Sequence, residues 1–133
     1  MFKTRIHLAA VTLMAMPMTA FALPPLISVD RIVDPLVEAR AADVVRKGCG
    51  AYSVNIVRAY REAKALESQA LKMGYTKAQV QSFIKDKAAK TVVKSRANEL
   101  LRTLGATGDE ASLCAAGDRL VQGSAIAAKL ISR

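Results

Sequence analysis

The residues best suited to covalent chemistry are two cysteines, Cys49 and Cys114, the only ones in a chain of 133 residues. In an oxidising compartment an even number of cysteines usually forms disulfides, and two cysteines allow a single intramolecular pairing. A bond across these 65 positions would stabilise the fold by up to about 4 kcal/mol through chain entropy. Two separate buried thiols are the alternative. A redox role is disfavoured, because redox cysteines often lie close together in sequence.

Basic side chains concentrate between residues 85 and 102, where six lysines and arginines face only two acids. Lys87, Lys90 and Lys94 are spaced three and four positions apart, so they share one face of a helix. This spacing predicts a cationic ridge that binds an anionic surface. A solvated helix face is the alternative, and it is the usual role of a charge run. Nucleic acid is a disfavoured partner, because single-strand grooves interleave aromatic residues with the cations.

Catalytic chemistry is poorly represented. His7 is the only histidine, and it lies in a segment that we expect to be removed. The remaining chain lacks the usual general base near neutral pH, the imidazole ligands of zinc and copper sites, and a histidine to activate a nucleophile. Glu62 and Glu67 are five positions apart and do not pair on a helix face. We therefore expect no enzyme, no catalytic residue, no metal site and no cofactor.

The N-terminus has the three parts of a secretory signal peptide. Lys3 and Arg5 begin it, an uncharged apolar stretch covers residues 8–21, and a small–large–small triplet ends at Ala22. Pro17, Pro24 and Pro25 interrupt the longer uncharged run of residues 8–28, which disfavours the alternative of an uncleaved membrane anchor. We expect residues 1–22 to be cleaved, leaving a periplasmic or secreted protein with no transmembrane anchor.

Cleavage after Ala22 would leave 111 residues, enough for one domain with a modest core. The formal net charge would fall from +9 to +7, because Lys3 and Arg5 leave with the signal. A positive surplus favours anionic partners such as lipid headgroups, envelope polymers or an acidic protein. The charge does not choose among them.

Apolar periodicity predicts an all-α fold, with no strand pattern of period two. Asp34 and Pro35 are typical of a helix start, so residues 23–33 are expected to form an extended lead-in to a single helical domain, 34–133. Thr76 and Gln79 predict a capping box. The helices are expected over residues 34–47, 52–73, 77–85, 87–104, 110–121 and 125–131. Together they predict a compact bundle of four to five helices with one disulfide.

Several short motifs, in this order along the chain, resemble an uncharacterised bacterial family, domain-of-unknown-function family 5333. They are Pro24-Pro25-Leu26, Arg46-Lys47-x-Cys49, Arg58-Ala59-Tyr60, Gly74-Tyr75, Leu113-Cys114 and Gly123-Ser124-x-Ile126. The resemblance covers nearly the whole chain and implies a small exported helical protein. It implies no activity.

Two functional hypotheses follow. The first is a non-enzymatic binding module of the cell envelope, whose basic surface meets an anionic envelope component or an acidic protein. The alternative is a structural or assembly factor, whose apolar helix faces pack against another protein or a second copy. Salt distinguishes them, because charge-driven binding weakens steeply with ionic strength and apolar association persists.

Overall fold

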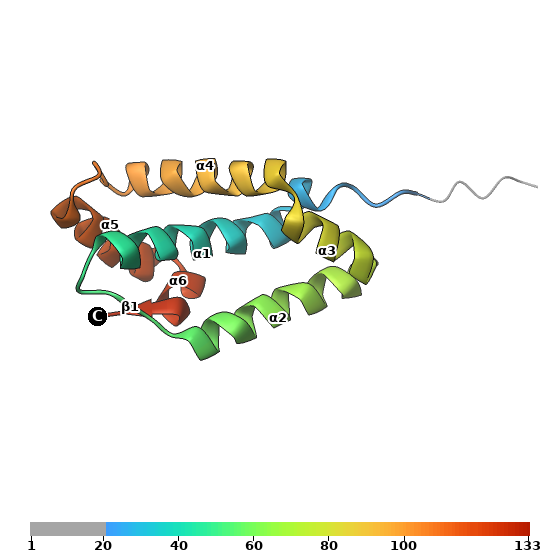
Figure 1. The fold of residues 1–133 in the computed structure, drawn as a ribbon, viewed down its shortest axis with the longest axis horizontal. Coiled ribbons are helices and arrows are strands. Elements are labelled where there is room, and N and C mark those ends of the chain that lie inside the picture. Colours follow the sequence, from blue (N-terminus) through green and yellow to red (C-terminus); the bar gives the residue numbers. More distant parts are fainter. Residues whose placement is uncertain (1–20) are drawn as a thin grey trace, which may run out of the picture.

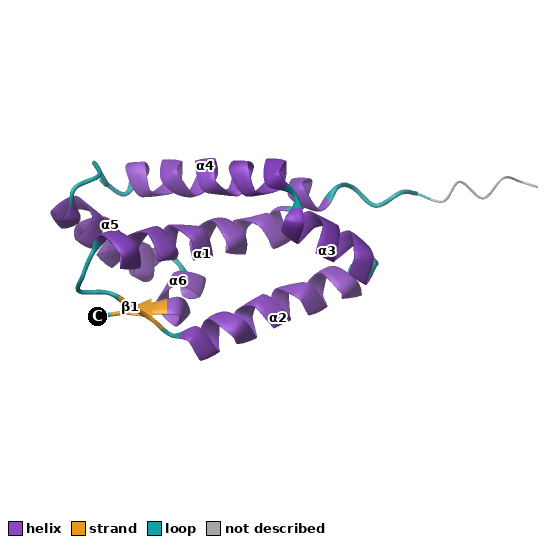
Figure 2. Cartoon of the chain, in the orientation of Figure 1, coloured by secondary structure: helices purple, strands orange, loops and turns teal. Residues whose placement is uncertain are grey.

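The computed structural model describes residues 21–133, which form a bundle of helices around one central helix (Figures 1 and 2). The expected export signal lies outside the described residues, except for its last two positions. The elements in chain order are η1 (Leu26–Ser28), α1 (Asp30–Gly48), β1 (Ser53–Val54), α2 (Ile56–Lys72), α3 (Lys77–Lys85), α4 (Lys87–Thr103), α5 (Glu110–Gly123), α6 (Ala125–Leu130) and β2 (Ile131–Ser132). The predicted helical fold is confirmed.

Helix α1 forms the centre of the bundle. Figure 1 shows α4 along one side of α1 and α2 along the other, with α3 joining them at one end. Val33, Val37, Ala41 and Val45 recur every four positions of α1, and all four are buried in the main core. They pack against the inner faces of α4, α5 and α6. The stripe on α1 therefore fixes the positions of three other helices.

The start of α1 differs from the prediction. The helix begins at Asp30 instead of Asp34, so Pro35 lies inside it and the lead-in before η1 covers only residues 21–25. Pro35 lacks the N–H that would bond to the carbonyl of the preceding turn, but the additional turn buries Ile32 and Val33. Asp34, expected to cap the helix, instead forms an ion pair with Arg96 of α4 at 2.6 Å.

The turns around α3 follow the prediction closely. The backbone N–H of Gln79 donates to the Thr76 hydroxyl at 3.1 Å, and the Gln79 side chain accepts from the Thr76 N–H at 2.8 Å. Asp86 accepts from the N–H of Ala88 and starts α4 directly after α3. This local chemistry folds α2, α3 and α4 into a U-shaped unit around one end of α1 (Figure 1).

Two very short strands correct the prediction that no strand would form. Ser53 pairs with Ser132, and Val54 pairs with Ile131, in antiparallel register. Because each strand has two residues, no alternating pattern marks either in the sequence. Helix α2 accordingly begins at Ile56, later than expected, and α6 ends at Leu130. The pairing ties the end of the chain to the start of α2.

The predicted disulfide between Cys49 and Cys114 is present, and it joins the end of α1 to α5. Cys49 is fully buried. Helix α5 approaches α1 closely beside it, because Gly117 has no side chain: a Cβ there would lie 2.6 Å from a methyl group of Val45. Among the helices of residues 21–133, none is long and apolar enough to cross a bilayer.

Candidate functional site

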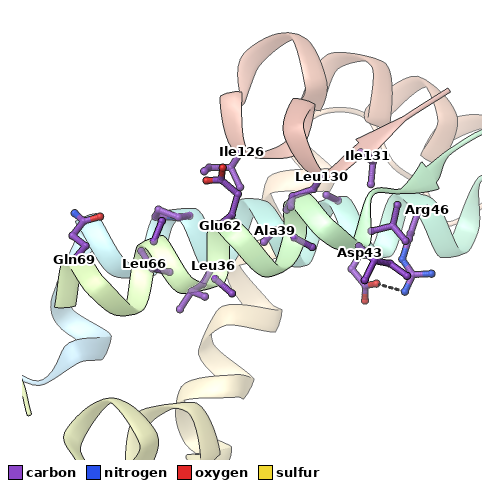
Figure 3. Close-up of a pocket in the computed structure, with 17 residues that line it drawn as sticks. Leu36, Ala39, Asp43, Arg46, Glu62, Leu66, Gln69, Ile126, Leu130 and Ile131 are labelled. Atoms are coloured by element: carbon purple, nitrogen blue, oxygen red, sulfur yellow. Dashed lines mark ion pairs between the residues drawn. The ribbon is translucent and has the colours of Figure 1, made fainter. Parts of the chain in front are cut away.

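Helices α1, α2 and α6 enclose an open groove of about 500 Å³, which we call the wide groove. Figure 3 shows Leu36 and Ala39 of α1, Leu66 of α2, and Ile126 and Leu130 of α6 around it. Most of its lining is aliphatic. Its size falls in the range of about 300–1,000 Å³ typical of ligand pockets.

The wide groove exists because α2 packs loosely. Ala70 is the only residue of α2 that is buried. Ala59 and Ala63 face the groove, and methyl groups are too small to fill the space between α2 and α1. At the start of the helix, Ile56 and Val57 are 74% and 61% exposed. Helix α2 therefore presents apolar surface that residues 21–133 leave uncovered.

Charged groups at the edge of the wide groove pair with one another. Asp43 contacts Arg46 and Lys47 at 2.8 Å and Arg40 at 3.1 Å (Figure 3 marks the Arg46 pair). Partial burial raises the pKa of Asp43, but the hydrogen bond and charge of Lys47 and the charge of Arg46 outweigh it, so the pKa lies below its ordinary value of 3.8. Three cations thus share one carboxylate.

A second groove, of about 440 Å³, lies between α1, α3 and α4, and we call it the basic groove. Its apolar lining is Leu36, Phe83, Ile84, Ala89 and Val93, and its polar lining is Arg40, Lys90 and Lys94. Leu36 lines both grooves. No acid is among the eight residues that line the basic groove, so its positive charge is not neutralised from within.

The three lysines of the predicted ridge are exposed on α4. Lys90 and Lys94 lie at the basic groove, whereas Lys87 is not part of its lining. None of the three forms an ion pair with any residue of 21–133, although Arg96 and Arg102 on the same helix do. The structure therefore joins two of the three predicted lysines to an apolar hollow.

Sequence reasoning missed the partners of these lysines. Arg40 and Leu36 lie on α1 and Ile84 lies on α3, whereas the lysines lie on α4. Only tertiary packing brings them to α4. The exposed Ile84, at 52%, gave no separate signal, because it sits within an ordinary helical pattern.

A polar cluster near the C-terminus has a structural role. The Tyr52 hydroxyl donates to Asp118 at 2.6 Å, and Arg133 pairs with Asp118 while its guanidinium lies over the Tyr52 ring. Burial, together with the hydrogen bond to Asp118, raises the pKa of Tyr52 above its ordinary value of 10.0. The cluster closes the contact between β1, α5 and the chain end.

Within residues 21–133, no three His, Cys, Asp or Glu side chains could hold a metal ion.

Comparison with known families matches residues 24–131 to a family model described as "Family of unknown function (DUF5333)". The match covers most of the chain and nearly all of the described residues, in agreement with the resemblance of the short motifs. No curated protein and no solved structure matches the chain significantly.

Proposed function

Because the chain belongs to DUF5333, a family of unknown function, we propose a function from its own surface. The protein is a non-enzymatic binding module of the cell envelope, and the basic side of α4 engages an anionic partner. The observation that carries this proposal is the pair Lys90 and Lys94, which flank the basic groove with no acid in its lining.

Electrostatics support this choice of surface. Lysines without ion-pair partners leave a positive potential that attracts anions. Arg40 adds to it, because it shares the single charge of Asp43 with two other cations. At the wide groove, by contrast, Glu62 pairs with Lys129 at 3.0 Å. The basic groove is therefore the better place for an anion.

Placement in the envelope rests on two observations. The Cys49–Cys114 disulfide is the kind of bond that persists in oxidising compartments and is rare in the cytosol. The pattern of residues 1–22 is that of a cleavable export signal. Mass spectrometry of the protein isolated from its cells tests this placement. A mass that begins at Leu23 supports it, and a species that retains Met1 contradicts it.

A charge-reversal variant tests the binding surface. The K87E/K90E/K94E protein should bind acidic polyglutamate and vesicles of phosphatidylglycerol far more weakly than the wild type. Wild-type binding should also weaken as salt rises from low to moderate concentration, because screening lengths shrink to about 10 Å at 0.1 M. Fluorescence anisotropy and vesicle sedimentation measure the two probes.

The matched control places the same charge change on α2. Arg58, Arg61 and Lys72 are exposed and have no ion pair among residues 21–133, so R58E/R61E/K72E alters the net charge equally. This control should retain most of the binding. Equal losses in both variants would mean that net charge alone drives binding, and the proposed surface would then be wrong.

The exposed start of α2 favours a second candidate, an assembly factor that uses the wide groove. Ile56 lines this groove, and Ile56, Val57 and Tyr60 of α2 are at least 61% exposed. Neighbouring apolar residues of this kind often mark protein contacts. Sedimentation velocity tests this candidate. A dimer that persists at high salt and dissociates in I56S/V57S would favour it, and a monomer at all concentrations would count against self-assembly.

A further inference from the structure

We propose that the basic groove binds a single-chain anionic amphiphile. The aliphatic chain lies along Phe83, Ile84 and Val93, and the phosphate or carboxylate head lies at Lys90 and Lys94. This inference rests on the proposed function and deepens it, because it names the chemical class of the anionic partner.

The apolar part of the site is already exposed to water. Phe83 and Ile84 at the end of α3 line the groove together with Val93 of α4 and Leu36 of α1, and Ile84 is about half exposed. A ligand chain would cover this surface. Each buried methylene contributes enough transfer free energy to raise affinity about fourfold.

The cationic part lies beside this apolar surface. Lys90 and Lys94 are one helical turn apart on α4, so their Cβ atoms are about 5–6 Å from each other. Lysine stems pack along apolar surface while the ammonium groups stay in water, an arrangement that suits the boundary between a chain and its headgroup. Arg40 approaches from α1. One anionic head can therefore contact cations from two helices.

Shape decides between a single amphiphile and a membrane surface. The basic groove is a hollow of about 440 Å³, within the range of small-molecule sites. A flat bilayer would contact its rim and leave the hollow unfilled, whereas one chain can enter it. The wide groove lacks this combination, because Arg46, the one cation in its lining, pairs with Asp43. Lys90 and Lys94 of the basic groove form no ion pair among residues 21–133.

Isothermal titration calorimetry of the purified, disulfide-bonded protein with alkyl phosphates tests the proposal. Hexyl, octyl and decyl phosphate, below their micelle-forming concentrations, should bind with affinities that rise roughly fifteenfold for each two methylenes. Inorganic phosphate and decanol each supply half of the ligand. Each should bind at least about tenfold more weakly than decyl phosphate.

Paired variants separate the two halves of the site. K94Q should lower the affinity for decyl phosphate about tenfold. K72Q, which replaces an exposed lysine of α2 outside the groove lining, should change it little. I84S should lower the affinity for decyl phosphate and leave the binding of inorganic phosphate unchanged. V92S replaces another exposed apolar residue outside the groove lining and should have no effect. Thermal unfolding of each variant verifies that it is folded.

The outcomes distinguish this inference from the proposed function. The amphiphile proposal is wrong if decyl phosphate binds no more tightly than inorganic phosphate, or if I84S and V92S have the same affinity for decyl phosphate. The basic surface would then still bind anions. If phosphatidylglycerol vesicles bind and monomeric decyl phosphate does not, the partner is a membrane and the inference is also overturned. If neither K94Q nor K90Q weakens the binding of any of these anions, both proposals fail.

Discussion

Tyr52 donates a hydrogen bond of 2.6 Å to Asp118, although the two residues are 66 positions apart in the chain. The bond lies beside the Cys49–Cys114 disulfide and joins the segment after α1 to the middle of α5. Arg133 pairs with the same carboxylate. One carboxylate thus connects the residue before β1, helix α5 and the end of the chain.

This relationship predicts a loss of stability at alkaline pH. The pKa of Tyr52 in the folded protein is raised above 10.0 by burial and by Asp118, so folding favours the neutral phenol. Its contribution is fully present below pH 10 and is lost as the pH rises through the folded pKa. Urea unfolding between about pH 8 and pH 11 measures it. Y52F should lose about 1 kcal/mol at the lower pH and show a weaker alkaline decline.

Tyr60 provides the control for the alkaline measurement, because its side chain is exposed. Y60F should follow the wild-type pH profile within experimental error. An alkaline decline that is equally steep in Y52F and the wild type would show that another group causes it.

The disulfide should contribute strongly to stability. Replacing both Cys49 and Cys114 with alanine should lower the free energy of unfolding by about 2–4 kcal/mol, because the cross-link constrains a long loop of the unfolded chain. Urea denaturation of oxidised wild type and the double variant measures this difference. A difference under about 0.5 kcal/mol would be inconsistent with the constraint.

Gly117 is predicted to be intolerant of any side chain. A Cβ at this position would lie 2.6 Å from Val45 and 2.9 Å from the Tyr52 ring, so G117A should cost about 1–3 kcal/mol by overpacking. At Gly123, the last residue of the same helix, no atom beyond the adjoining residues and the backbone of its own helix lies within 4 Å of the point that a Cβ would occupy. G123A should therefore leave stability unchanged or raise it slightly. Thermal melts compare the two variants directly, and coinciding melts would be incompatible with this packing.

The ion pairs of Asp43 predict a small loss of stability in acid. Its folded pKa is lowered by Lys47 and Arg46, so its stabilisation is present above pH 3.8 and is lost as the pH falls through the folded pKa. D43N should be less stable than the wild type at neutral pH, by under about 1 kcal/mol because the pairs are partly exposed. The difference, measured by urea unfolding, should shrink as the pH falls below 3.8. A difference that stays constant with pH would exclude the ion pairs as its source.

Local sequence signals predicted local structure well. The capping box of Thr76 and Gln79 involves side chains only three positions apart, so its geometry is written in a short segment. The start of α1 was misplaced for the opposite reason. The preference of Asp34 and Pro35 for a helix start was outweighed by burial of Ile32 and Val33 in the assembled core, which no short segment reveals.

The candidate site was predicted in part. Lysine spacing on α4 indicated a shared face, because helix geometry alone fixes it. The apolar hollow beside Lys90 and Lys94 required Arg40 and Leu36 from α1 and Ile84 from α3. Their approach depends on how α1 packs inside the U formed by α2, α3 and α4. Helical periodicity does not specify that packing.

The position of a bound anion on the protein decides whether the basic groove is the binding site. Amide chemical shifts of the ¹⁵N-labelled protein, followed during titration with decyl phosphate, report which residues the ligand contacts. We expect the largest saturable changes at Arg40, Ile84, Lys90 and Lys94, and little change along the exposed face of α2. Changes centred on Ile56 and Tyr60, or no saturable change at all, would show that the anion does not bind in the basic groove.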